Sequence, residues 1–122
     1  MRQFLGGLGI LVLFLVNASA QDFRGRFHSE DEYQLVHSWF DQVQADLNQA
    51  AKDTPAILVD KSRSQFSAVE RNWDNGIYDS RQIDDAIATL RAVADDSRLL
   101  PADRDKLAAD WSRMIDLRAE FY

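Results

Sequence analysis

Metal binding is the first chemistry that the spacing of side chains suggests. His37 and Asp41 lie four residues apart, so on a helix their side chains share one face and could bind the same ion. They supply only two ligands, whereas a closed zinc site uses four. The other histidine, His28, lies in a segment without periodicity. We therefore predict no metal site and no cofactor, with both histidines at the surface.

A calcium loop around Gly76 is the second candidate. If Gly76 took the invariant sixth position of an EF-hand loop, Arg71 and Trp73 would fall on liganding positions. Gln82 would then replace the bidentate glutamate at the twelfth position. Since the side chains of arginine and tryptophan offer no oxygen ligand, we interpret the glycine as the end of a helix.

Paired carboxylates could carry acid–base catalysis, and adjacent pairs occur at Asp84-Asp85 and at Asp95-Asp96. Neighbouring side chains on a helix point about 100° apart, so neither pair converges on a substrate. A catalytic pair also needs one carboxyl group whose pKa is raised by burial, and both pairs fall on faces predicted to be solvated. The sequence has no cysteine, no G-x-S-x-G motif and no glycine-rich phosphate loop. We therefore predict that the protein is not an enzyme.

The turn between the last two predicted helices carries more charged side chains than a helix connection requires. We predict that four of them form an ion-pair network across the turn, namely Asp85, Arg98, Arg104 and Asp105. If they point separately into solvent, the turn becomes a candidate binding site for a partner instead.

Three tryptophans offer a further candidate surface for recognition. Trp39, Trp73 and Trp111 all lie on or beside the apolar stripes of predicted helices, so core packing is the favoured interpretation. A tryptophan exposed beside a tyrosine would instead mark a partner-binding patch. The sequence leaves open which of the three lie in the core.

The elements that position these residues follow an N-terminal export signal. Arg2 supplies a positive charge, Phe4–Val16 is an apolar run, and Ala18-Ser19-Ala20 matches a cleavage site. We predict a signal peptide at 1–20, cleavage after Ala20, a flexible arm at 21–28 and a single helical domain at 29–122. The mature protein is expected in the periplasm or outside the cell.

Charge and cysteine content restrict the partners of this domain. The formal net charge is −6 at pH 7, which disfavours binding to nucleic acid and to anionic membrane surfaces. Without cysteine, the fold must be held together by packing alone. We expect a protein partner of unknown identity, no nucleic acid and no membrane association after signal cleavage, and homo-oligomerisation stays open.

Apolar residues that recur every three or four positions predict four helices, at about 30–52, 55–73, 80–97 and 102–120. The short connections favour an all-α fold, a small antiparallel up-and-down four-helix bundle. A three-helix packing with the second helix splayed away is the alternative. Thr54 is predicted to cap the second helix, with Pro55 as its first residue, and Asp79 or Ser80 to cap the third.

The polar faces of these helices are predicted to face solvent. This prediction places Asp46 on the outer face of the first helix. It places Asp103 in the first turn of the fourth helix, where a negative charge complements the helix dipole. Lys106 and Asp110 have the i,i+4 spacing of a surface ion pair.

The C-terminal part carries a resemblance to known sequences. Its motifs are Tyr78-Asp79, Ile83-Asp84-Asp85-Ala86-Ile87 and the turn Asp96–Asp105. On these motifs, residues 77–118 resemble a group of small, uncharacterised exported bacterial helical proteins. The pattern departs at Leu100, where a serine is expected, so the fourth helix lacks a capping side chain. The resemblance implies bacterial export and a helical fold, and no activity.

Taken together, these features favour a non-enzymatic exported helical protein that acts by protein–protein contact. The first alternative is a small-ligand or metal-binding bundle with His37, Asp41 or Glu70 pointing inward. The second alternative is a periplasmic stress chaperone with an exposed apolar face.

Overall fold

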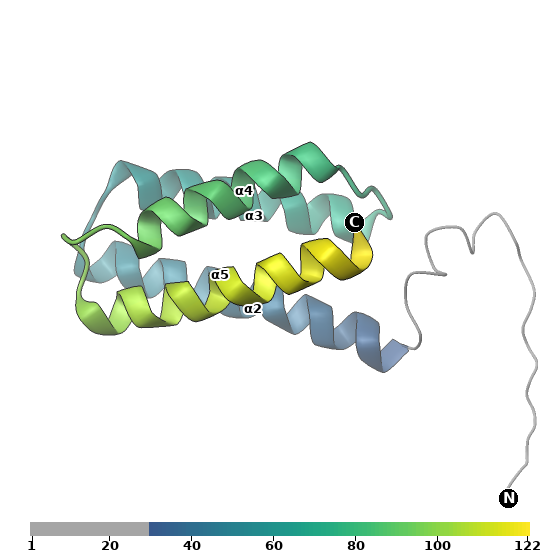
Figure 1. Cartoon of the computed structure of the whole chain (residues 1–122), viewed down its shortest axis with the longest axis horizontal. Coiled ribbons are helices and arrows are strands. Elements are labelled where there is room, and N and C mark those ends of the chain that lie inside the picture. The colour runs from purple at the N-terminus through teal and green to yellow at the C-terminus, as the bar shows by residue number, and fades with distance from the viewer. Residues whose placement is uncertain (1–29) are drawn as a thin grey trace, which may run out of the picture.

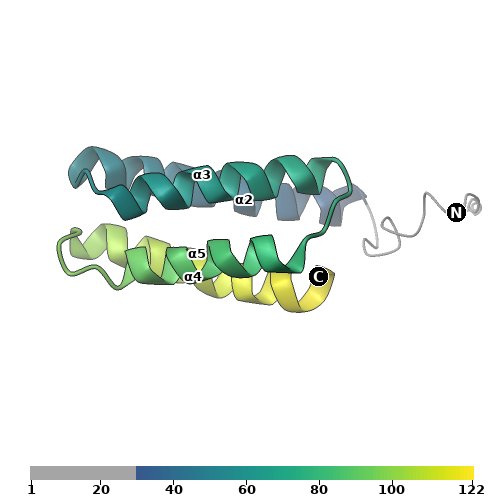
Figure 2. The same ribbon diagram turned by 90° about the horizontal axis from the view of Figure 1, so that it is seen from above.

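The computed structural model describes residues 30–122, which form four helices and no strand. They are α2 (Glu30–Asp53), α3 (Ile57–Asp74), α4 (Ser80–Ala94) and α5 (Pro101–Phe121). Within this part of the chain the backbone of each helix packs against two neighbours, in the cyclic order α2, α3, α4, α5, and the backbones of the diagonal pairs stay apart. Figure 1 shows that successive helices run in opposite directions, and Figure 2 shows the α2–α3 hairpin beside the α4–α5 hairpin. The prediction of an up-and-down four-helix bundle is confirmed.

The predicted signal peptide at 1–20, the arm at 21–28 and the Ser29 cap lie outside the described residues. Among the four described helices, none combines the length and the apolar character that crossing a membrane requires.

An apolar core fills the space between the helices, with contributions from all four stripes. Its largest fully buried side chain is Trp73, near the end of α3. Phe40 of α2 and Phe121 of α5 each pack edge-on against Trp73 with ring centroids 5.7 Å away. Edge-to-face aromatic pairs add to the free energy gained from burial itself. This aromatic cluster therefore ties α2, α3 and α5 together at the end of the bundle where α2 begins and α5 ends (Figure 1).

The boundary between α2 and α3 differs from the prediction. The N–H of Thr54 donates to the carbonyl of Ala50 at 2.8 Å, so Thr54 extends the hydrogen bonding of α2 and does not cap the next helix. Ala56, with φ −154° and ψ 146°, is the N-cap residue of α3, and it offers no side-chain acceptor. As a result α3 begins at Ile57, two residues later than predicted.

Other helix ends follow the expected chemistry. Asp79 caps α4 by accepting hydrogen bonds from the N–H groups of Arg81 and Gln82. Gly76, with φ 75°, occupies the left-handed region after α3, where other residues are strained. Leu100 precedes α5 without a capping side chain, as the sequence indicates.

Three acidic residues are buried although the sequence places them on solvated faces or in surface pairs. Asp46, Asp103 and Asp110 have exposed fractions of 7%, 4% and 1%. Asp110 does not pair with Lys106 but accepts a hydrogen bond from Arg113 at 3.4 Å. The prediction is wrong here because α2 and α5 pack along a seam beside their apolar stripes, which covers polar side chains at its border.

Candidate metal-binding site

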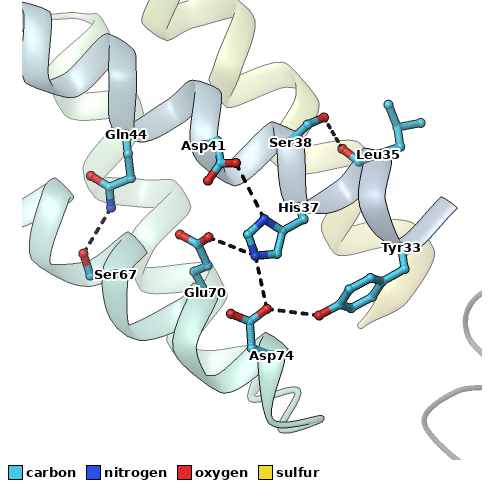
Figure 3. Close-up of polar contacts among 9 residues, drawn as sticks. All are labelled: Tyr33, Leu35, His37, Ser38, Asp41, Gln44, Ser67, Glu70 and Asp74. Carbon is cyan, nitrogen blue, oxygen red and sulfur yellow. Dashed lines mark hydrogen bonds and ion pairs between the residues drawn. The ribbon is translucent and has the colours of Figure 1, made fainter. Parts of the chain in front are cut away.

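A cluster of one imidazole and three carboxylates lies between α2 and α3. His37 and Asp41 lie one turn apart on α2, and Glu70 and Asp74 lie one turn apart on α3. Because the two helices are antiparallel neighbours, these pairs face each other, and Figure 3 shows the imidazole of His37 directed at the α3 carboxylates. The tight connection at residues 54–56 sets the register that brings the four side chains together.

Distances within the cluster match those between ligands of one ion. The Nε2 atom of His37 lies 3.3 Å from Oε2 of Glu70 and 3.4 Å from Oδ1 of Asp74. One candidate ligand atom from each of these three residues lies within 4.8 Å of the others. Two ligands about 2.1 Å from a tetrahedral ion are about 3.4 Å apart. Small side-chain movements would therefore let all three bind one ion.

Two further contacts orient the candidate ligands. Oδ2 of Asp41 lies 3.7 Å from Nδ1 of His37, the ring nitrogen that faces away from the α3 carboxylates. The hydroxyl of Tyr33 donates a hydrogen bond to Oδ1 of Asp74 at 3.1 Å (Figure 3). In metal sites the second nitrogen of a histidine ligand commonly faces a carboxylate, and ligating carboxylates accept hydrogen bonds of this type.

The cluster has an excess of negative charge and is open to solvent. The side chains of His37, Glu70 and Asp74 are 30%, 21% and 43% exposed, so an ion could enter from water. Burial raises the pKa of Glu70, His37 opposes this shift, and the nearby Asp41 and Asp74 reinforce it. Even a protonated imidazole balances only one of the three carboxylates. A divalent cation would relieve the remaining repulsion.

The predicted network at the α4–α5 turn does not form. In the described chain none of Asp85, Arg98, Arg104 and Asp105 pairs with another of the four. Arg98 instead pairs with Asp96 at 2.7 Å, and the same carboxylate accepts the backbone N–H of Arg98. Because α4 ends at Ala94, Asp85 lies about 13 Å before the turn along the helix axis. The local pair therefore replaces the longer-range network.

The tryptophans divide into one core residue and two border residues. Trp73 is 1% exposed, which confirms core packing for this residue. Trp39 and Trp111 are partly buried against the core. The guanidinium of Arg91 lies 4.5 Å above the Trp111 ring, so this indole is covered by a cation from α4.

Along the sequence only Asp41 has the spacing of a ligand that shares an ion with His37, because Glu70 and Asp74 come from another helix. A usable signal was present in the sequence: His-x3-Asp and Glu-x3-Asp occur on consecutive helices that are joined by a short connection. Helical hairpins place such pairs face to face when the register allows it. The register itself depends on how the apolar stripes interlock, which spacing alone does not specify.

No protein-family model, curated protein or solved structure matches this chain. The resemblance of residues 77–118 to exported bacterial helical proteins therefore stays a prediction.

Proposed function

We propose that this protein is an exported, non-enzymatic helical bundle that binds one divalent transition-metal ion through His37, Glu70 and Asp74. The observation that carries the proposal is the convergence of their three ligand atoms within 4.8 Å. The contacts of Asp41 with His37 and of Tyr33 with Asp74 support it, because they would hold two ligands in place. The signal-like pattern at 1–20 supports export.

The donor set indicates the kind of ion. One imidazole nitrogen and two carboxylate oxygens suit zinc, cobalt, nickel or copper(II), whereas calcium prefers six to eight oxygen ligands. Three protein ligands leave a fourth position for water or for a group from a partner. A partner protein could supply the fourth ligand. The protein-contact role that the sequence favours would then use the same site.

Exposed apolar side chains give weaker support to partner or chaperone function. Partner or client binding requires a contiguous apolar patch. The large apolar residues exposed in the region 30–122 are instead distributed over α2, the start of α3, two loops and α5: Leu35, Ile57, Ile77, Leu100 and Ile115. The metal site is therefore the better-supported function.

Calorimetric titration with zinc tests the proposal directly. The purified protein is first dialysed against a chelator, and we expect one equivalent of zinc to bind. Cobalt(II) should give the intense visible absorption of a tetrahedral site, which reports the ligand geometry independently of affinity.

Single substitutions identify the ligands. His37→Ala and Asp74→Asn should each weaken zinc binding by about tenfold or more, in line with the loss of a ligand or its support. Asp105→Asn removes one negative charge from an exposed residue of α5 outside the cluster and should bind zinc as the wild type does. Equal affinity in His37→Ala and the wild type, or no stoichiometric binding at all, would overturn the proposal.

A further inference from the structure

Two contacts between acidic side chains close the seam between α2 and α5. Asp110 of α5 adjoins Asp46 of α2, and Asp103 of α5 adjoins Asp53 of α2, closely enough for each pair of carboxyl groups to share a hydrogen bond. We call each contact a carboxyl clasp. The two clasps are seven residues apart on both helices, in opposite chain directions, as two antiparallel helices require.

The groups around each clasp repeat with the same spacing. On α2, the side-chain amide of Gln42 donates to Asp46 at 3.0 Å, and that of Gln49 donates to Asp53 at 3.1 Å. On α5, a basic residue follows each aspartate by three positions: Lys106 follows Asp103, and Arg113 follows Asp110. The arrangement is therefore built twice from the same parts, which argues against a chance approach of two acids.

A hydrogen bond within a clasp requires a shared proton. An ionised carboxylate only accepts hydrogen bonds, so two carboxyl groups can bond to each other only when one of them is protonated. In each clasp the α5 member has a buried Oδ2 atom that no N–H or O–H donor of residues 30–122 reaches, in Asp103 and in Asp110. These buried oxygens are the natural positions for the two protons.

The charges that face the clasps agree with this assignment. Burial raises the pKa of Asp110 to about 8, with Asp46 adding to the shift and Arg113 opposing it. Burial likewise raises the pKa of Asp103, and the neighbouring Asp53 raises it further.

The basic side chains near the seam lie on α2, α5 and α4. Lys52 of α2 and Lys106 of α5 act on Asp53. Arg91 of α4, the other helix packed against α5, is engaged with Trp111 and Asp95. Asp46 and Asp110 both line an open groove of about 470 Å³.

We propose that the two carboxyl clasps make the α2–α5 seam a proton-dependent closure, which is tight at acidic pH and weakens when the shared protons are lost. The other three seams of the bundle join helices that are consecutive in the chain, whereas α2 and α5 are joined by packing alone. Loss of the protons would leave facing carboxylates at the seam that no loop holds together, and their repulsion favours opening.

The sign of the effect follows from the two states of Asp110. In the folded protein Asp110 keeps its proton up to a pKa of about 8. In the unfolded chain it loses the proton near the ordinary aspartate pKa of about 3.9. The folded state therefore binds more protons between these values, so stability falls as the pH rises from about 4 to about 8 and changes little above that.

Thermal unfolding followed by circular dichroism tests the closure, in chelator so that metal binding does not contribute. The wild-type Tm should fall by several degrees from about pH 5.5 to about pH 8.5. Asp110→Asn keeps a neutral donor opposite Asp46 but cannot titrate, so its Tm should depend much less on pH. Asp103→Asn should flatten the profile to a smaller extent. Asp105→Asn, the same substitution at an exposed position outside the clasps, should keep the wild-type profile.

A wild-type slope in Asp110→Asn would overturn the proposal. A second measurement needs no variant that folds: nuclear magnetic resonance of the aspartate carboxyl carbons in the wild type. One carboxyl group should titrate near pH 8. If every carboxyl group titrated near the ordinary value of about 4, the proposal would fail.

Discussion

At the scale of single residues, two polar clusters carry the proposals, one as a candidate cation site and one as a candidate site for shared protons. His37 bridges α2 and α3 by facing Glu70 and Asp74 through one ring nitrogen and Asp41 through the other. The carboxyl clasps join α2 to α5 on a different side of α2. In both clusters bound positive charge would relieve the repulsion between acidic side chains, supplied by a metal ion in the first case and by protons in the second.

Tyr33 provides a residue-scale prediction about the metal site. Tyr33→Phe removes the hydrogen bond to Asp74 and keeps the ring, so zinc affinity should fall by about tenfold while the helical content stays unchanged. Calorimetric titration measures the change. Tyr122→Phe removes a hydroxyl outside the cluster and is the matched control. An unchanged affinity in Tyr33→Phe would show that the hydroxyl does not orient Asp74.

At the scale of helices, the ends determine how each element is positioned. Asp79 holds the start of α4 with two side-chain hydrogen bonds, whereas Ala56 and Leu100 start α3 and α5 without any. Local chemistry also ends α4 early, because Asp96 binds both the backbone and the guanidinium of Arg98. Helices that lack caps depend more on packing against their neighbours.

The missing cap on α5 can be supplied by one substitution. Leu100 is 50% exposed and has the extended conformation of an N-cap residue, with φ −62° and ψ 142°. Leu100→Ser should therefore raise the free energy of unfolding by about 1 kcal/mol, as measured by urea denaturation. Leu100→Ala removes the same apolar side chain without adding an acceptor. If both variants were equally stable, capping would not be the source of the gain.

At the scale of the whole molecule, the aromatic cluster links stability to the metal site. Trp73 contacts Phe40 and Phe121 and directly precedes Asp74 in α3. The packing that holds the end of α3 against the bundle therefore also holds two of the three candidate ligands in register.

Substitution of the core tryptophan and of one border tryptophan tests this link. Trp73→Ala should lower the free energy of unfolding by about 3–5 kcal/mol, because it empties a fully buried site, and should weaken zinc binding as well. Trp111→Ala removes a partly buried ring under Arg91, so it should destabilise the fold less and leave zinc affinity unchanged. Chemical denaturation and calorimetry provide the two measurements. Wild-type zinc binding in a folded Trp73→Ala variant would contradict the link.

The sequence by itself determined the number of helices, their approximate bounds and the up-and-down order, because apolar spacing and local caps act within a few residues. It also narrowed the cap of α4 to Asp79 or Ser80, of which the structure has Asp79, and identified the missing cap at Leu100. These features depend on contacts along one helix, which sequence spacing reports directly.

Only the tertiary structure decided which polar residues meet across helices. The spacing of His37 and Asp41 was visible, but Glu70 and Asp74 join them through the register of α2 against α3. Asp46 and Asp110 belong to polar faces in sequence, yet packing of α2 on α5 buries both. Register and seam position result from the interlocking of all four apolar stripes, and side chains at the border of a stripe become buried or exposed according to that packing.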